Sequence, residues 1–340
     1  MSTHHPRPDL DLWKQADLVT PMVIRVAATY SVADHIVAGR TTATVIAEAE
    51  GLHAGALDRV LRHLAGVGLL HRDGTGYGLT ERGRFLLSDH PSGMRALWDL
   101  RGALGRADLS VTELAHAVTT GEPGFPVRFG QSFWDDLAAD PARAQSFNSL
   151  MASNIAHSAH EIAQAYDWST LGHVMDVGGG NGLLLAALLT AHPTLRGSVL
   201  DLPASLDTAR RTFADRGVGD RAEALAGSFF DSLPSGADGY ILSSVIHNWD
   251  DDDTLAILKR CAEAAGERGR VFVIEQTGED GESPNTIMDL RMLVFFAGKE
   301  RGVSEIVELA RNAGLTFVAA HSAPGRVAAR SVVEFTAGPR

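Results

Sequence analysis

The stretch VMDVGGGNGLLLAALL, Val174–Leu189, decides how the second half of the chain folds. An apolar run ends at Val177, glycines occupy positions 178, 179, 180 and 182, and a leucine-rich run begins directly after them. Glycine lets the backbone turn tightly and lie close to a ligand, because it has no Cβ. The pattern predicts a strand, a tight turn that contacts a small molecule, and a helix.

Two phosphate-binding patterns do not fit this turn. A dinucleotide fingerprint starting at Gly178 requires a glycine at position 183, where Leu183 stands, and the lysine of a P-loop is absent. About twenty residues further on, a second apolar run ends in Asp201, whose carboxylate can accept hydrogen bonds from both hydroxyls of a ribose. The glycines alone are equally typical of a structural turn, but together with Asp201 they favour a nucleoside without a pyrophosphate.

Composition limits the class of protein. The 340 residues are 45% hydrophobic and 21% charged, which is typical of a globular chain long enough for two domains. The formal charge of −12 argues against nucleic acid as the main partner, because phosphate binding needs clustered Lys and Arg. The lone Cys261 excludes a disulfide framework, and we find no pattern of a signal peptide or membrane span. We expect a cytoplasmic protein that binds small molecules, not nucleic acid or membrane.

The pattern of apolar residues changes near residue 170. Helical periodicity precedes this point, and strands alternate with helices after it. We expect an N-terminal domain at 1–100, a helical linker and substrate lid at 101–170, and a catalytic domain at 171–340. Strands are predicted at 173–177, 197–202, 222–226, 239–245, 269–276, 315–323 and 331–337. The short link between the last two implies antiparallel pairing, so we predict an α/β fold with a Rossmann-like doubly wound sheet and an antiparallel edge pair.

Residues 41–87 have the pattern of a winged helix-turn-helix. A capped helix reaches Gly51, a second helix covers Ala54–Val67, and a short hairpin follows around Asp73–Gly76. Such a module either reads DNA or serves for packing and dimerisation. Acidic residues surround its few cations, so no basic face forms and the second interpretation is favoured. The first domain is expected to be mainly α-helical.

The segment between the two domains carries candidate pocket residues. Gly121–Leu137 is rich in Pro, Gly and aromatic residues and is expected to be a loop or lid in which Phe133 and Trp134 face a ligand. The helix after it carries one face with spacings of four and three, made of Phe147, Met151 and Asn154. Such a face is also typical of a helix that packs against a core.

Six motifs occur in one order between residues 176 and 302. They are DVGGGNG at 176–182, DLP at 201–203, AGSFFDSLPSGAD at 226–238, SSVIHNWDDDDTLAILKRC at 243–261, VFVIEQ at 271–276 and MLVFFAGKERG at 292–302. In this order they resemble the class I S-adenosylmethionine-dependent O-methyltransferases of the plant caffeate and flavonoid type and their bacterial natural-product branch. The resemblance implies S-adenosylmethionine as cofactor, S-adenosylhomocysteine as product, and a homodimer formed through the N-terminal domain, which helps to line the substrate pocket.

The resemblance also implies binding residues. It places the methionine end of the cofactor at the 178–182 loop, the ribose on Asp201, and the adenine between Leu202 and Phe229. The full cofactor set is Gly178, Gly180, Asp201, Leu202, Ser228, Phe229 and Ser243. The acceptor is expected to be a small, flat, hydroxylated aromatic molecule, and its set is Trp134, Phe147, Met151, Asn154, Asn248, Met292 and Phe296.

His247 is the candidate general base. It follows the fourth predicted strand at its carboxyl end, where a doubly wound sheet presents groups to a ligand. Methyl transfer from a sulfonium starts from an activated donor, so the enzyme has to position the acceptor oxygen and remove its proton. A phenol titrates near ~10 and a histidine near ~6.5, so a neutral imidazole in contact can take the proton as the oxygen attacks.

Two carboxylates are candidates to orient this imidazole. Glu275 ends the fifth predicted strand and Glu300 lies in the GKERG segment, and both match paired glutamates of the family. An acceptor on the second ring nitrogen fixes the tautomer and stabilises the imidazolium. The alternatives are a solvent-facing strand end for Glu275 and a surface ion pair of Glu300 with Lys299 or Arg301.

The four consecutive aspartates Asp250–Asp253 are expected to cap a helix. Their side chains satisfy free N–H groups and complement the helix dipole, and the apolar residues after them repeat at helical spacing. A cation site is the alternative, but no His or Cys ligand spacing accompanies the aspartates. We predict no metal requirement.

Two positions depart from the family pattern. Ser228 stands where an aspartate usually accepts from the adenine amino group, and Asn248 stands where aspartate is common beside the histidine. We weigh four functions: O-methylation of a phenolic or other hydroxyl of an aromatic, polyketide-like natural product; a cofactor-retaining relative that catalyses hydroxylation or a pericyclic step; a winged-helix regulator; and a binding scaffold without turnover. The first is favoured, because the base and both glutamates are present.

Overall fold

The computed structural model describes residues 8–156, 158–277, 285–324 and 329–337. By their contacts the chain divides into two units, one of Met1–Asp108 with Asp140–Leu150 and the other of Leu109–Ala139 with Met151–Arg340. Within the described residues, none of the helices is both long and apolar enough to cross a membrane.

The first unit is mainly helical and contains the predicted winged helix-turn-helix. The cap of α4 is Thr42, whose hydroxyl accepts a hydrogen bond from the N–H of Val45, and the helix ends at Gly51 with a φ of 68°. The wing is a two-stranded antiparallel hairpin. The helices and strands of the first unit are α1 (Pro8–Ala16), α2 (Val19–Thr29), α3 (Val32–Val37), α4 (Ala43–Glu50), α5 (Ala54–Gly66), β1 (Leu70–Asp73), β2 (Gly76–Leu79), α6 (Met94–Trp98) and α7 (Ala103–Ala107).

The second unit holds a seven-stranded sheet, and the residues of helix α11 (Pro141–Ala156) are divided between the two units. Its helices are α8 (Leu114–Thr120), α9 (Gly124–Phe129), α10 (Phe133–Ala138), α12 (Ala159–Ala165), α13 (Leu183–Ala191), α14 (Pro203–Asp215), α15 (Asp251–Ala265), α16 (Thr286–Phe296) and α17 (Val303–Asn312). Its strands are β3 (His173–Val177), β4 (Arg196–Asp201), β5 (Ala222–Ala226), β6 (Gly239–Ser243), β7 (Arg270–Gln276), β8 (Leu315–Ala323) and β9 (Arg330–Ala337).

The strand order is β5-β4-β3-β6-β7-β9-β8, and this confirms the predicted α/β class. The first five strands in this order are parallel, while β9 runs antiparallel to both β7 and β8. The chain moves outward from β3 to β5, then returns to the other side of β3 for β6. This reversal is the topological switch point at which doubly wound sheets bind ligands.

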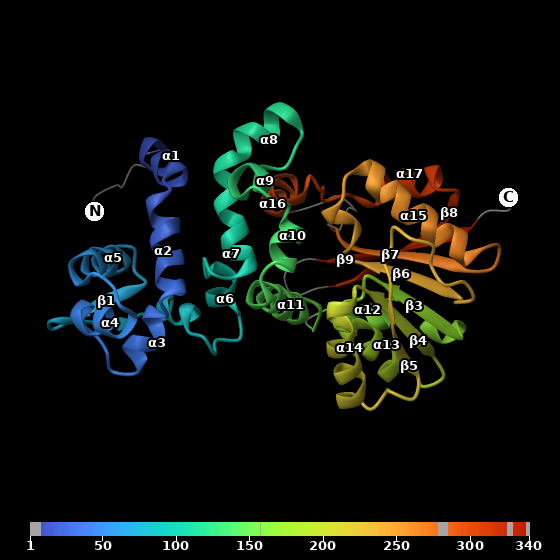
Figure 1. The fold of residues 1–340 in the computed structure, drawn as a ribbon, viewed down its shortest axis with the longest axis horizontal. Coiled ribbons are helices and arrows are strands. Elements are labelled where there is room, and N and C mark those ends of the chain that lie inside the picture. The colour runs from blue at the N-terminus through green and yellow to red at the C-terminus, as the bar shows by residue number, and fades with distance from the viewer. Residues whose placement is uncertain (1–7, 157, 278–284, 325–328, 338–340) are drawn as a thin grey trace, which may run out of the picture. The chain divides into compact units, whose positions relative to one another are not determined.

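Helices cover both faces of the sheet (Figure 1). Helices α12, α13 and α14 pack on one face, and α15 and α17 pack on the other. Successive strand residues point to opposite faces, so Val174 and Ile241 enter the first core while Met175 and Leu242 enter the second. A sheet buried on both faces explains why the parallel strands are nearly continuous apolar runs.

The segment Gly121–Leu137 differs from the expected loop. Two short helices, α9 and α10, occupy most of it, and α10 begins at a cap in which the Ser132 hydroxyl accepts from the N–H of Asp135. Phe133 is 2% exposed and packs edge to face against the rings of Phe125 and Phe296, so its prediction as a ligand-facing residue is wrong. The aromatic residues of this segment pack against one another. Composition alone does not distinguish such packed rings from those of a flexible lid.

Candidate active site

The site lies at the carboxyl ends of two neighbouring strands. The glycine loop follows β3 and the histidine turn follows β6, and these strands are paired in parallel. Because the carboxyl ends of parallel strands meet at one edge of the sheet, the two segments lie side by side at the switch point.

The glycine loop has a backbone that side chains would obstruct. Gly178 and Gly180 have φ values of 75° and 57°, which L residues rarely adopt. A Cβ on Gly178 would lie 3.1 Å from Val245 Cγ2. The N–H of Gly180 donates to Asp201 Oδ2 at 2.8 Å, so the loop and the predicted ribose carboxylate are in direct contact.

The other predicted cofactor residues have different surroundings. The Ser243 hydroxyl is buried and has no hydrogen-bond partner among the described residues. Ser228 Oγ accepts from the N–H of Phe230, the ring of Phe229 packs against that of Trp249, and Leu202 is 61% exposed. A glycine backbone open to approach, a carboxylate beside it and an unpaired hydroxyl together fit a nucleoside with polar substituents.

Asp176 is a buried acid that sequence reasoning missed. It is 1% exposed, and neither carboxylate oxygen has a hydrogen-bond partner among the described residues. Burial, with a smaller contribution from nearby Asp201, raises the pKa of Asp176 to about 7. The sequence signal that could identify it is its place at the start of the DVGGGNG motif.

Two carboxylates face the same ring nitrogen of His247. His247 occupies a 3-10 turn, Ile246–Asn248, and its Nδ1 is 3.3 Å from Glu275 Oε2 and 3.5 Å from Glu300 Oε1. Glu275 is 2% exposed and Glu300 5% exposed. The surface alternatives for both glutamates are therefore wrong: Lys299 pairs with Glu305, and Arg301 pairs with Asp251.

The two carboxylates change the acid–base character of the imidazole. Burial alone lowers the pKa of His247, but Glu275 and then Glu300 outweigh it, and the net pKa lies above the ordinary histidine value. With two acceptors facing Nδ1, the neutral ring carries its proton on that atom. Nε2 is then the atom that can accept a proton.

Backbone contacts hold each glutamate in place. Glu275 Oε1 accepts from the N–H groups of Val245 and Ile246, both at 3.1 Å, so Glu275 also fixes the start of the histidine turn. The N–H of Glu300 donates to Asp289 Oδ1 at 3.0 Å. Burial raises the pKa of Glu300, and the charges of Glu275 and Asp289 raise it further against the opposing effect of His247.

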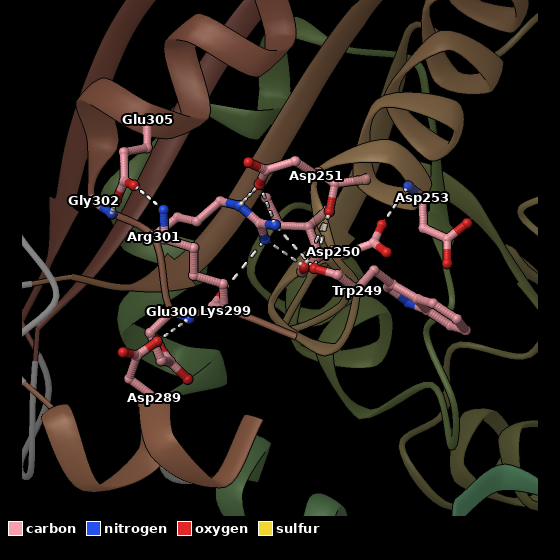
Figure 2. A network of polar contacts seen from close by, with 12 residues as sticks. Trp249, Asp250, Asp251, Asp253, Asp289, Lys299, Glu300, Arg301, Gly302 and Glu305 are labelled. Atoms are coloured by element: carbon pink, nitrogen blue, oxygen red, sulfur yellow. Dashed lines mark hydrogen bonds and ion pairs between the residues drawn. The ribbon is translucent and has the colours of Figure 1, made fainter. Parts of the chain in front are cut away.

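The aspartate run caps a helix, as expected, and also holds an ion pair that was not expected. Asp250 Oδ1 accepts from the N–H of Asp253 at 2.8 Å, which confirms the cap of α15. Asp251 Oδ1 accepts from Nη2 of Arg301 at 2.7 Å, and Figure 2 shows the long Arg301 side chain extending to this helix start. No group of three or more His, Cys, Asp or Glu that suits a metal ion occurs among the described residues.

Aromatic rings from separate segments come together near the turn. Trp134 stacks on Phe296 at 5.4 Å between ring centroids with an interplanar angle of 18°, and on Trp249 at 6.2 Å and 16°. Trp249 was missed by sequence reasoning, although it directly follows the candidate Asn248. The Met292 side chain is buried in α16.

The predicted face of α11 is divided between the two units. Phe147, Met151 and Asn154 do lie on one continuous helix, as expected. Phe147 and Met151 are half-buried and Asn154 is exposed. Phe147 belongs to the first unit and the other two to the second.

Two family models match the chain. One, described as the O-methyltransferase domain, matches residues 111–316, and the other, described as the O-methyltransferase dimerisation domain, matches residues 13–89. The second match includes the winged helix-turn-helix and agrees with its interpretation as a dimerisation module.

Similar proteins come from bacterial natural-product biosynthesis. A 2,7-dihydroxy-5-methyl-1-naphthoate 7-O-methyltransferase of Streptomyces carzinostaticus is 55% identical, with 95% of this chain and 96% of that protein covered. The aclacinomycin 10-hydroxylase RdmB of Streptomyces purpurascens is 42% identical, with 97% and 91% covered.

Solved structures agree with these relatives. The crystal structure of NcsB1, an O-methyltransferase from neocarzinostatin biosynthesis, in complex with S-adenosyl-L-homocysteine and 1,4-dihydroxy-2-naphthoic acid has a TM-score of 0.91. It is 52% identical, and 99% of this chain and 100% of that chain are covered. A second NcsB1 structure contains S-adenosylmethionine and 2-hydroxy-5-methyl naphthoic acid.

Proposed function

The chain belongs to the O-methyltransferase family, whose cofactor is S-adenosylmethionine, and we propose that it methylates a hydroxyl group of a flat aromatic natural product with His247 as general base. The observation that carries the base assignment is the placement of His247 Nδ1 against two buried carboxylates, 3.3 and 3.5 Å away. When bound, the cofactor supplies an activated methyl group on a sulfonium.

The residues of the site have three tasks in this reaction. The loop Gly178–Gly182 and Asp201 hold the nucleoside, and the Ser243 hydroxyl is free to donate to its polar end. His247 takes the hydroxyl proton on Nε2 as the oxygen attacks. Glu275 and Glu300 stabilise the resulting imidazolium, because both carboxylates already face its Nδ1.

Replacement of the base tests this assignment. His247→Ala should lower kcat by on the order of 10²–10⁴, because proton removal is lost while the cofactor residues remain. S-adenosylmethionine binding, measured by calorimetry, should stay within a few-fold of the parent protein. Near-normal turnover of His247→Ala would refute the base assignment.

The acceptor class follows from the rings beside the turn. The ring of Trp134 is nearly parallel to the rings of Phe296 and Trp249. A group of parallel aromatic rings favours a planar aromatic acceptor, because flat rings prefer offset stacking on other flat rings. Relatives act on or bind hydroxylated naphthoates, so 2,7-dihydroxy-5-methyl-1-naphthoate is the first acceptor to test. Mass spectrometry should detect a gain of one methylene that depends on S-adenosylmethionine.

A second candidate function has a specific observation in its favour. The hydroxylase RdmB is 42% identical over nearly the whole chain, and Ser228 and Asn248 differ from the aspartates that the family resemblance implies at these two positions. In that case the product gains one oxygen atom, for which molecular oxygen and an external two-electron reductant are required as co-reactants, and S-adenosylmethionine is not consumed. Measurement of S-adenosylhomocysteine formation beside product mass separates the two reactions.

We further propose a role for each segment of the chain and a location in the cell. Residues 1–100 form the homodimer interface, 101–170 line and cover the acceptor, and 171–340 bind the cofactor and perform catalysis. The match of 13–89 to a dimerisation domain and the lack of a basic face both favour this over a DNA-binding regulator. A cytoplasmic location fits a substrate and a cofactor that are both small molecules. Light scattering of the purified protein should give the mass of a dimer.

A further inference from the structure

We propose that Arg301, acting with Asp251 and Gly298, is a positioning element that fixes the orientation of His247 toward its two glutamates. The proposal rests on the assignment of His247 as the base. It concerns residues that surround the histidine turn and do not touch the reacting groups themselves.

The guanidinium of Arg301 bridges the histidine turn. Its Nη1 donates to the carbonyl of Ile246 at 2.8 Å, and its Nη2 donates to the carbonyl of Trp249 at 2.9 Å. These carbonyls lie one residue before and two residues after His247. The Arg301 side chain is 1% exposed, so both hydrogen bonds form away from water.

Asp251 completes the environment of this buried cation. Its Oδ1 accepts from Nε of Arg301 at 3.1 Å and from Nη2 at 2.7 Å (Figure 2). The Asp251 side chain is itself 62% exposed, so only the guanidinium is removed from water, and Asp251 supplies the charge that compensates it. One side chain thus connects the start of α15, the histidine turn and the segment that carries Glu300.

The same segment contacts the histidine turn through its backbone. The N–H of Lys299 donates to the carbonyl of His247 at 3.0 Å. A Cβ on Gly298 would lie 2.2 Å from that carbonyl oxygen and 2.8 Å from the carbonyl carbon of Asn248, so this approach requires glycine. The 298–301 segment therefore brings Glu300 to Nδ1 while it holds the backbone of His247 itself.

The planar geometry of arginine matters for this arrangement. Its donors point in fixed directions, so one side chain reaches two carbonyls and a carboxylate together, whereas a lysine ammonium is a compact charge on a flexible stem. Arg301→Lys keeps the charge but removes the bridge. Because the charge at position 301 is kept, a fall in the pKa of His247 then reports a weaker effect of the two glutamates, since a loss of burial or of the nearby Arg330 charge would raise the pKa instead.

Titration of the histidines by NMR tests the proposal without an acceptor substrate. In ¹³C- and ¹⁵N-histidine-labelled protein, the His247 signal is identified by its loss in His247→Gln. In Arg301→Lys the His247 midpoint should fall towards the ordinary histidine value, because the carboxylates that raise it are less closely held. Arg268→Lys and Asp252→Asn, exposed positions after and within α15, should leave it unchanged. An unmoved midpoint in Arg301→Lys overturns the proposal.

Kinetic measurements provide a second test, and they distinguish a failure of this proposal from a failure of the proposed function. Arg301→Lys should lower kcat about 10- to 100-fold with little change in the KM for S-adenosylmethionine, because misplacement of a reacting group costs rate more than cofactor binding. If His247→Ala is inactive but Arg301→Lys has normal kcat, only the positioning role fails. If His247→Ala is active, the base assignment itself fails.

If Arg301→Lys does not fold, Asp251→Asn provides an alternative test of the same proposal. It keeps an oxygen acceptor for the guanidinium but removes the charge, so the same downward shift of the His247 midpoint is expected at smaller size. A folded Asp251→Asn with an unchanged midpoint and unchanged kcat overturns the proposal in the same way.

Discussion

Glu275 contacts His247 through one carboxylate oxygen and holds the histidine turn through the other. Oε2 lies 3.3 Å from His247 Nδ1, while Oε1 accepts the N–H groups of Val245 and Ile246. The end of β7 therefore provides both the charge and the anchor for the residue that follows β6.

The pH dependence of turnover should report the charge of Glu275. Turnover requires neutral His247, whose pKa is raised, so kcat should increase with pH through a limb above the ordinary histidine value. Glu275→Gln removes the larger of the two raising charges, so the limb should move to lower pH and the plateau should drop. Rate measurements from pH 5 to 9 at saturating cofactor check this. A limb that stays in place in Glu275→Gln contradicts the electrostatic role.

Stability should separate the two glutamates. Glu275→Ala leaves two buried backbone N–H groups without their acceptor, so we expect a loss of about 1–3 kcal/mol in the free energy of unfolding. Glu300→Ala keeps its own N–H bonded to Asp289 and should lose less. Urea denaturation of both variants without cofactor measures the difference. Equal losses would show that the contacts of Glu275 with the turn do not contribute to stability.

The sheet could be predicted from the sequence because its signals are local. Runs such as His173–Val177 and Ala222–Ala226 are short and apolar and are separated by helical periodicity, and the structure has both strands at the predicted residues. The close link between β8 and β9 left only antiparallel pairing. The order of strands at the switch point then put the glycine loop beside the histidine turn.

The contacts around the turn could not be predicted, because they join segments about fifty residues apart. Glu300 was assigned from a family pattern, but its neighbour Arg301 has the same appearance in sequence as any exposed arginine. Only the fold shows that Arg301 is buried against Asp251 and two carbonyls. The burial of Phe133 in α10 could not be predicted for the same reason, because it depends on contacts with rings from α9 and α16.

Asp176 should make stability fall as the pH rises. Its pKa is about 7 in the folded protein and 3.8 ordinarily, so the folded state keeps a proton that the unfolded state has lost between these values. Stability associated with this proton is complete below 3.8 and is lost as pH rises to about 7. Asp176→Asn removes this titration.

Urea denaturation at pH 5 and pH 8, without cofactor, measures the effect. The parent protein should lose more stability between the two pH values than Asp176→Asn, by on the order of 2 kcal/mol. The comparison of variants cancels groups that titrate equally in both proteins. Parallel losses would mean that Asp176 is ionised in the folded state.

Replacement of Ser228 should strengthen cofactor binding. Its hydroxyl already accepts from the N–H of Phe230 at 3.2 Å, which leaves one uncharged acceptor position for the adenine amino group that the family pattern pairs with an aspartate here. Ser228→Asp adds a charged acceptor with two oxygens, so the Kd for S-adenosylmethionine should fall about tenfold. Ser228→Ala should change it by less than about threefold. Calorimetry of the three proteins decides, and a weaker Kd for Ser228→Asp would place the adenine elsewhere in the site.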